Sequence, residues 1–167
     1  MVKADDNQPG RKTGGTTTMW SLLDRVAELE RRGSTLYERF ADIFRQSPLV
    51  AAFWRDMAGE ERLHALIVGA AREVFPATAP AIAGQWTAQL AEIEKLLSHL
   101  ESKAAAGLSL AEAFTGAEQL EASELNTVTA LIIQHAGTGF SRLGALVEHS
   151  GVDRHRDKVL QARQRFL

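Results

Sequence analysis

Cysteine is absent from this sequence, and its absence narrows the chemistry that the chain can perform. Without thiols the chain can hold no disulfide, no thiolate-bound zinc, no rubredoxin-type iron and no iron–sulfur cluster. Any metal ion must therefore be held by carboxylate oxygens and imidazole nitrogens.

Two further absences concern partners. The formal net charge is only -2, so the chain has no basic field of the kind that binds nucleic acid. No uninterrupted apolar run reaches about 18 residues, the length that suggests a membrane span. We therefore expect neither nucleic acid nor a membrane as a partner.

The segment 1–18 contains almost no apolar side chains and cannot contribute to a core. We expect a flexible N-terminal tail over 1–18 and one domain over 19–167, since 45% hydrophobic and 24% charged residues are ordinary for a globular protein. The tail lacks the apolar segment of a secretory signal, which predicts a cytoplasmic location.

Strand patterns are missing as well, because apolar residues recur three or four positions apart and show no sustained alternation of period two. This spacing predicts an all-helical protein. Ser47 and Pro48 are typical of a helix start, Gly107 of a helix end, and Ser109 with Glu112 of a capping box. The expected helices cover about 20–46, 48–68, 86–105, 110–135 and 140–162, the last of them bent or divided at 150–151.

Acidic residues interrupt three of the apolar stripes. Glu30 lies in the stripe of the first helix, Glu61 in that of the second and Glu121 in that of the fourth. His64 follows Glu61 by three residues, so their side chains share one helix face. A carboxylate and an imidazole placed in this way can bind one metal ion.

An internal repeat connects these positions. Glu30 and His64 are 34 residues apart, as are Glu121 and His155, so an offset of 91 superimposes two helix pairs. This offset predicts two related halves, each contributing an acid and a histidine.

Four-helix bundles that bind two metal ions use one Glu from each of two helices and a Glu-x-x-His from each of the other two, and this chain offers five of those six ligands. Leu29-Glu30 with Tyr37 seven residues on, followed by Met57-Ala58-Gly59-Glu60-Glu61-Arg62-Leu63-His64, resembles the first half of rubrerythrin-like proteins in the ferritin-like superfamily. The resemblance covers roughly 20–165. It implies a ferritin-like four-helix bundle built from two helix pairs, with a long connection that contains an additional helix. Without cysteine, the sequence has no counterpart of the rubredoxin domain.

The resemblance implies a site for iron, with one or two ions, and manganese or zinc are compatible with the same ligands. Val152 stands where the repeat and the family predict a second bridging Glu, and Val128 stands where Tyr37 would recur. Tyr37 is the candidate catalytic residue, as a donor of a proton or an electron. The implied metal ligands are Glu30, Glu61, His64, Glu121 and His155, with Glu148 as a further candidate.

Some of these residues also have ordinary interpretations. His155 lies between Arg154 and Arg156 and fits a solvated cationic stretch equally well. Tyr37 fits the core of a helical bundle, and Glu60 is expected to face solvent.

The leading functional hypothesis is a non-haem metal protein, a rubrerythrin-like oxidoreductase that acts on peroxide or oxygen with an external electron donor. The loss of one bridging acid predicts a reduced or asymmetric site. The alternative is a structural or interaction protein that keeps the ferritin-like bundle with an incomplete, inactive metal site. Iron storage has less support because nothing predicts a closed shell, and a homodimer is compatible with a bundle of this size.

Overall fold

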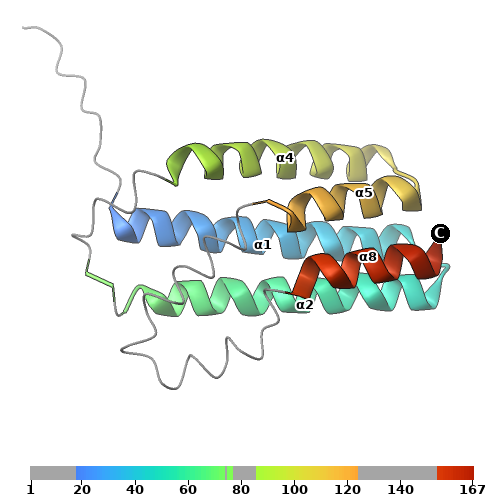
Figure 1. Cartoon of the computed structure of the whole chain (residues 1–167), viewed down its shortest axis with the longest axis horizontal. Coiled ribbons are helices and arrows are strands. Elements are labelled where there is room, and N and C mark those ends of the chain that lie inside the picture. Colours follow the sequence, from blue (N-terminus) through green and yellow to red (C-terminus); the bar gives the residue numbers. More distant parts are fainter. Residues whose placement is uncertain (1–17, 74, 77–85, 124–153) are drawn as a thin grey trace, which may run out of the picture.

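The computed structural model describes residues 18–73, 75–76, 86–123 and 154–167, and all regular structure within these ranges is helical. The helices lie side by side with their long axes roughly aligned (Figure 1). They are α1 (Met19–Ile43), α2 (Pro48–Ala71), α4 (Thr87–Ala106), α5 (Leu110–Glu121) and α8 (His155–Phe166). The expectation of an all-helical protein is confirmed for this part of the chain.

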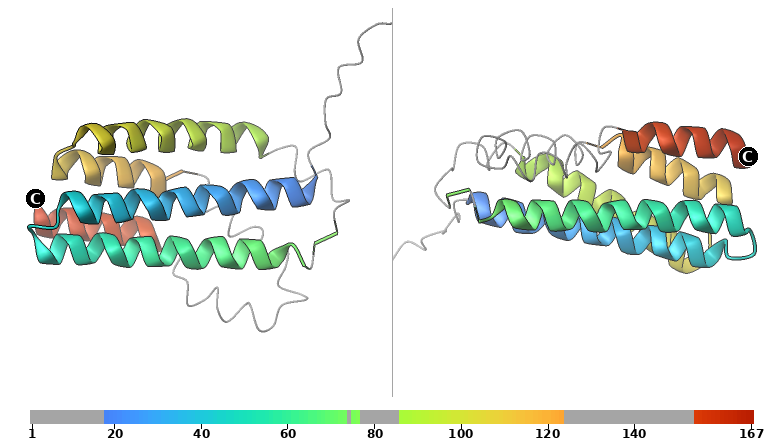
Figure 2. Two further views of the ribbon diagram at one scale, coloured as in Figure 1. Left: turned by 180° about the vertical axis from the view of Figure 1, so that it is seen from behind. Right: turned by 90° about the horizontal axis from the view of Figure 1, so that it is seen from below.

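The two longest helices, α1 and α2, form an antiparallel pair joined by a short turn at one end of the molecule (Figure 1). The turned views show α4 running along α1, while α5 and α8 lie next to each other beside the same end of the α1–α2 pair (Figure 2). Four helices, α1, α2, α5 and α8, therefore approach one another in one half of the molecule.

The starts of α1 and α2 follow local sequence rules. Thr18 caps α1, because its side chain accepts a hydrogen bond from the Ser21 amide, so the helical domain begins one residue earlier than the predicted tail boundary. Pro48 occupies the first position of α2, where a missing N–H costs nothing. Ser47 precedes it as expected but makes no side-chain capping bond within α2.

The end of α4 and the start of α5 also agree with prediction. Gly107 ends α4 with a φ of 91°, a left-handed conformation that favours glycine, and Ser109 with Glu112 forms the capping box of α5. The prediction of an unbroken helix from 110 toward 135 is wrong, because α5 ends at Glu121. The Ala122 amide still donates to the Glu118 carbonyl, and the Ser123 amide then donates to the Leu120 carbonyl at 3.0 Å, which closes the helix with a tighter turn.

Aromatic side chains fill the core at the end where four helices meet. The ring of Tyr37 stacks on Trp54 with centroids 5.6 Å apart, and Phe114 lies 4.9 Å from Trp54 and 5.8 Å from Phe53. Trp54, Tyr37 and Phe114 are fully buried. This cluster connects α1, α2 and α5 by apolar contact and supports the polar residues beside it.

Two bidentate ion pairs hold α4 against α1. Arg25 bonds Glu94 at 2.6 and 2.8 Å, and seven residues later in both helices Arg32 bonds Glu101 at 2.8 and 2.7 Å. Arg32 therefore pairs across to α4, while Glu30 points into the core with no exposed surface.

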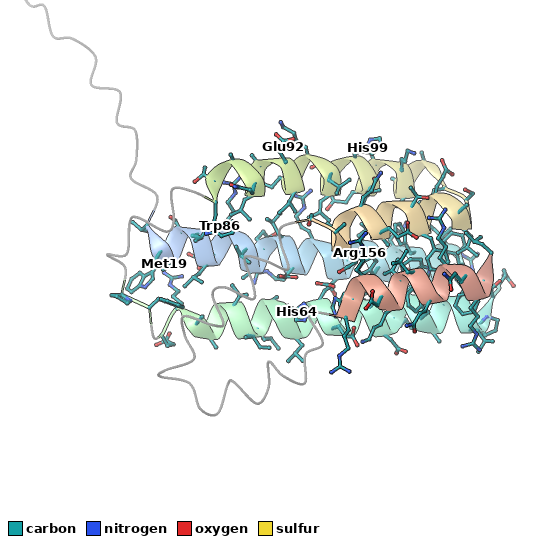
Figure 3. The ribbon with its side chains drawn as sticks, in the orientation of Figure 1. Met19, His64, Trp86, Glu92, His99 and Arg156 are labelled. Carbon is teal, nitrogen blue, oxygen red and sulfur yellow. The ribbon has the colours of Figure 1, made fainter. Side chains whose placement is uncertain are left out.

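The outer face of α4 carries polar residues such as Glu92 and His99, which point away from the other helices (Figure 3). His99 is thus a surface residue. Among the described residues, no helix is long and apolar enough to cross a membrane. The predicted tail up to residue 17, Val128, Glu148 and Val152 lie outside the described residues.

Candidate metal centre

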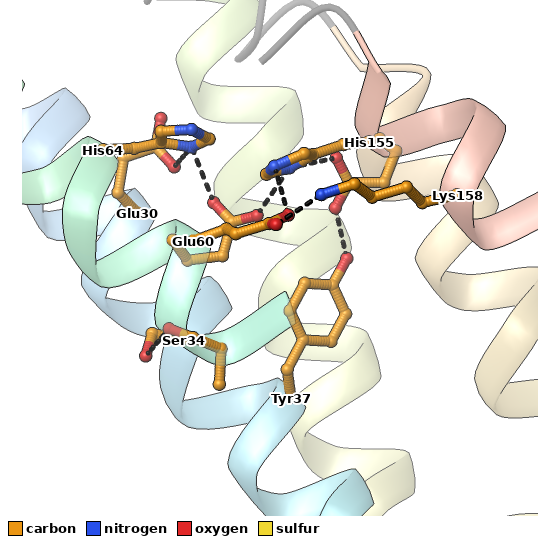
Figure 4. A network of polar contacts seen from close by, with 10 residues as sticks. Glu30, Ser34, Tyr37, Glu60, His64, His155 and Lys158 are labelled. Carbon is orange, nitrogen blue, oxygen red and sulfur yellow. Dashed lines mark hydrogen bonds and ion pairs between the residues drawn. The ribbon is translucent and has the colours of Figure 1, made fainter. Parts of the chain in front are cut away.

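A cluster of titratable side chains is buried where α1, α2, α5 and α8 approach one another (Figure 4). Each side chain lies on the inward stripe of its helix, because residues three or four apart share a face. The structure brings together all five ligands that the sequence predicts within the described part of the chain. They are Glu30 from α1, Glu61 and His64 from α2, Glu121 from α5 and His155 from α8.

Glu61 occupies the centre of this cluster. Its Oε2 lies 3.4 Å from His64 Nδ1, and its Oε1 lies 3.1 Å from His155 Nδ1. The two imidazole rings are nearly parallel, with centroids 4.8 Å apart. Glu61 therefore presents one oxygen to each histidine, which is the arrangement expected of a bridging carboxylate.

Each histidine has a second carboxylate beside the same ring nitrogen. Glu30 Oε2 lies 3.8 Å from His64 Nδ1, and Glu121 Oε2 lies 3.4 Å from His155 Nδ1. The site thus has two ends, one with Glu30 and His64 and the other with Glu121 and His155, as the predicted repeat pairs them. Glu61 is shared between them.

The ligand atoms at the His155 end lie within ion-pair distance of one another but lack hydrogen-bond geometry. Within the described residues, His155 Nδ1 and Glu61 Oε1 are buried and make no hydrogen bond of acceptable angle, although they lie 3.1 Å apart. Buried polar atoms normally have a partner. Ligand atoms of Glu61, His64 and His155 also lie within 4.8 Å of one another, a spacing that one cation can span. The residues present therefore fit a metal ion.

His155 is fully buried, whereas Arg154 and Arg156 on either side are exposed. The interpretation of this histidine as part of a solvated cationic stretch is therefore wrong. Periodicity allowed both possibilities, and the packing of α8 against α2 and α5 excludes the solvated one.

Glu60 also belongs to the site, contrary to the expectation that it faces solvent. Its Oε2 lies 2.8 Å from His155 Nε2, and its Oε1 forms an ion pair with Lys158, one turn after His155 on α8 (Figure 4). Its side chain is 28% exposed. A single helix predicts only that Glu60 points about 100° away from Glu61, and α8 is the element that covers that direction.

The position of Tyr37 is compatible with both of its interpretations, as a core residue and as a donor beside the site. It is buried in the aromatic core, and its hydroxyl donates a hydrogen bond of 2.5 Å to Glu121 Oε1. Burial, followed by the Glu121 carboxylate, raises the pKa of Tyr37 well above its ordinary value, so the phenol stays protonated and remains a donor. Tyr37 therefore orients one predicted ligand.

Glu121 is the last residue of α5, where the partial negative charge of the helix opposes a carboxylate. Residues that break local rules in this way are often found at functional sites.

Charges in the cluster shift one another strongly. Burial raises the pKa of Glu30 to about 8, whereas the two imidazoles outweigh burial and hold the pKa of Glu61 well below its usual range. Burial alone would lower the pKa of both histidines, but the neighbouring carboxylates raise the pKa of His64 to about 10 and that of His155 to about 12. Without metal, imidazolium and carboxylate charges can therefore balance each other.

Comparison of the chain with protein-family models, with curated proteins and with solved structures finds no match. The resemblance to rubrerythrin-like proteins therefore stays a prediction from the sequence, and the geometry of the described residues carries the functional argument.

Proposed function

We propose that this chain is a metal-binding protein of ferritin-like type, in which α1, α2, α5 and α8 form a four-helix bundle around one or two ions of iron, manganese or zinc. One observation carries the proposal: the buried Glu61 carboxylate lies between His64 and His155, with one oxygen 3.4 Å and the other 3.1 Å from their Nδ1 atoms. Carboxylate oxygens and imidazole nitrogens are a ligand set that these three metals accept.

The five predicted ligands would divide between the two ends of the site. Glu30 and His64 would serve one end, Glu121 and His155 the other, and Glu61 would bridge them. Iron or manganese bound there would supply the electron transfer needed to reduce peroxide or oxygen, with electrons from an external donor. Tyr37 would keep Glu121 oriented through its hydroxyl group, and the aromatic cluster beneath would exclude water.

The direct test is metal analysis of protein purified without chelator from cells supplied with iron and manganese, followed by peroxide turnover with a reductant. We expect at least one bound ion per chain and turnover only in the iron-loaded or manganese-loaded protein. The matched control is Glu61→Gln, which keeps the size of the side chain and removes the bridging charge. A metal content far below one ion per chain in the wild type would overturn the proposal.

The repeat provides a second test of ligand number. Val152 occupies the position that corresponds to Glu61 under the offset of 91 residues. Val152→Glu should raise the metal stoichiometry toward two ions if the alignment of the halves is correct. Unchanged stoichiometry in a folded variant would show that the alignment is wrong.

The self-balancing charges favour one alternative, a structural or interaction protein in which the buried network serves the fold alone. His64 and His155 have raised pKa values and face acidic side chains, so the cluster does not require a cation for neutrality. Melting temperature with and without chelator separates the two functions. A ligand bound only by the folded state stabilises it by about 2.7 kcal/mol at a hundred times its Kd, or about 5–11 °C for a domain of this size, whereas the structural function predicts no shift.

A further inference from the structure

The acid at Glu60 is not one of the six ligand positions, yet it touches one of the histidines. Its Oε2 lies 2.8 Å from His155 Nε2, on the side of the ring opposite to the Nδ1 that faces Glu61 and Glu121. Lys158 holds the other oxygen of Glu60 in an ion pair. The imidazole is therefore contacted by acids at both nitrogens, and Glu60 is the one farther from the centre.

The contact of Glu60 with His155 Nε2 is an ion-pair contact that lacks hydrogen-bond angles among the described residues, as does the contact of Glu61 with Nδ1. A carboxylate on this side of a metal-binding histidine favours one orientation of the ring. If the proton of the neutral imidazole resides on Nε2 next to Glu60, Nδ1 carries the lone pair and faces Glu61 and Glu121. Glu60 comes from α2 and His155 from α8, so the contact also ties the histidine to the helix that carries Glu61.

The repeat does not reproduce this pair in the sequence. Under the offset of 91 residues, Glu60 corresponds to Gly151 and Lys158 corresponds to Ile67, and neither replacement can form an ion pair. The pair of Glu60 and Lys158 is therefore specific to His155 within the repeat.

Distances within the cluster differ between the two ends of the site. His155 Nδ1 lies 3.1 and 3.4 Å from the carboxylates of Glu61 and Glu121, whereas His64 Nδ1 lies 3.4 and 3.8 Å from those of Glu61 and Glu30. Glu121 is additionally held by a hydroxyl donor from α1. The ion-pair distances at Nδ1 are thus shorter at the His155 end.

We infer that Glu60, held by Lys158, is a positioning residue for His155 and makes the His155 end the tighter metal position. This inference rests on the proposed function and deepens it. The sequence suggests the reverse, because Glu61 and His64 form the intact Glu-x-x-His motif and the twin of Glu61 is Val152. The contact of Glu60 with His155, rather than the completeness of the Glu-x-x-His motif, decides which end of the site binds metal more tightly.

The test uses the full chain and cobalt(II), whose visible absorption reports the ligands around the ion, with zinc competition to measure affinity. Glu60→Ala should weaken the tighter position about 10- to 100-fold and change its spectrum, the size of effect known for outer partners of metal ligands. Glu60→Gln keeps an oxygen that can accept from Nε2 and should restore most of the affinity. Glu60 and Lys158 border a groove of about 740 Å³ between α2 and α8, so truncating Glu60 opens no closed cavity.

The matched control is Glu118→Ala. Glu118 forms an ion pair with Arg163 between α5 and α8 at 2.7 Å, with a similarly exposed side chain of 21%, and its ion-pair partner among the described residues is this arginine rather than a histidine. This variant should bind cobalt(II) like the wild type. His155→Ala should abolish the tighter position, and His64→Ala should leave it in place.

Three results would overturn the inference while leaving the proposed function intact. These are wild-type affinity in a folded Glu60→Ala variant, equal weakening by Glu118→Ala, and loss of the tighter position in His64→Ala but not in His155→Ala. Absence of any cobalt(II) binding by the wild type would instead remove the proposed function and this inference with it. Circular dichroism of each variant establishes that it is folded.

Discussion

Removing the hydroxyl of Tyr37 is the sharpest single perturbation of the buried network. Tyr37→Phe keeps the ring that stacks on Trp54, so the aromatic packing is preserved, but Glu121 Oε1 loses a donor at 2.5 Å. The Glu121 side chain is 3% exposed, so bulk water does not replace that donor. A buried polar group that loses its partner costs about 1–3 kcal/mol, and a charged acceptor lies in the upper part of that range.

The assay is urea unfolding of the chelator-treated protein, with thermal melting as a second measurement. The expected loss of about 1–3 kcal/mol corresponds to a fall of about 2–12 °C in melting temperature for a domain of this size. The matched control is Ser34→Ala, which removes a buried hydroxyl bonded at 2.8 Å to the neutral carbonyl of Ala58 and should cost only about 0.5–1.5 kcal/mol.

A double-mutant cycle with Glu121→Gln then isolates the interaction between the two side chains. We expect the effect of Tyr37→Phe to shrink when the acceptor is no longer a carboxylate. If Tyr37→Phe is as stable as the wild type, or if its effect is unchanged in the Glu121→Gln background, the hydrogen bond does not orient Glu121 as we reason.

Two other predictions concern packing and pH. Gly116→Ala should destabilise the protein by about 1–3 kcal/mol in urea unfolding, because the new Cβ would meet Leu100 Cδ2 at 2.4 Å. The control Gly69→Ala, whose new Cβ would have nothing within 4 Å, should be neutral or stabilising by up to about 1 kcal/mol. Equal effects of the two substitutions would contradict this packing. The metal-free protein should lose stability as the pH rises from 5 to 10. Folding raises the pKa of Glu30 from 4.5 to about 8 and that of His64 from 6.5 to about 10. The stabilisation that comes from a raised pKa is lost as the pH rises through the pKa of the folded state. Urea unfolding at pH 5, 7 and 9 with chelator measures this, and constant or rising stability would be inconsistent with buried protonated groups.

Metal binding should show the opposite pH dependence, because the ligands must release their protons to bind an ion. The difference in melting temperature between metal-loaded and chelator-treated protein should therefore grow from pH 6 to 8. A difference that shrinks over this range would indicate that bound metal does not use these histidines and carboxylates.

The sequence by itself determined where most helices begin and the inward direction of four side chains, those of Glu30, Glu61, His64 and Glu121. Caps such as Thr18 and Ser109 and the left-handed stop at Gly107 act within one turn, so they can be recognised without knowing the fold. The helical period also determines that Glu30 and Glu61 share the apolar face of their helices. For this reason the buried acids could be located before any tertiary contact was known.

Only the tertiary structure decided what surrounds those side chains. The period placed Glu60 about 100° from Glu61, but whether that direction meets water or another helix depends on where α8 packs. The same packing buries His155 between two exposed arginines. A clamp such as Glu60 with Lys158 joins residues 98 positions apart, and no local pattern encodes which partner a side chain meets across helices.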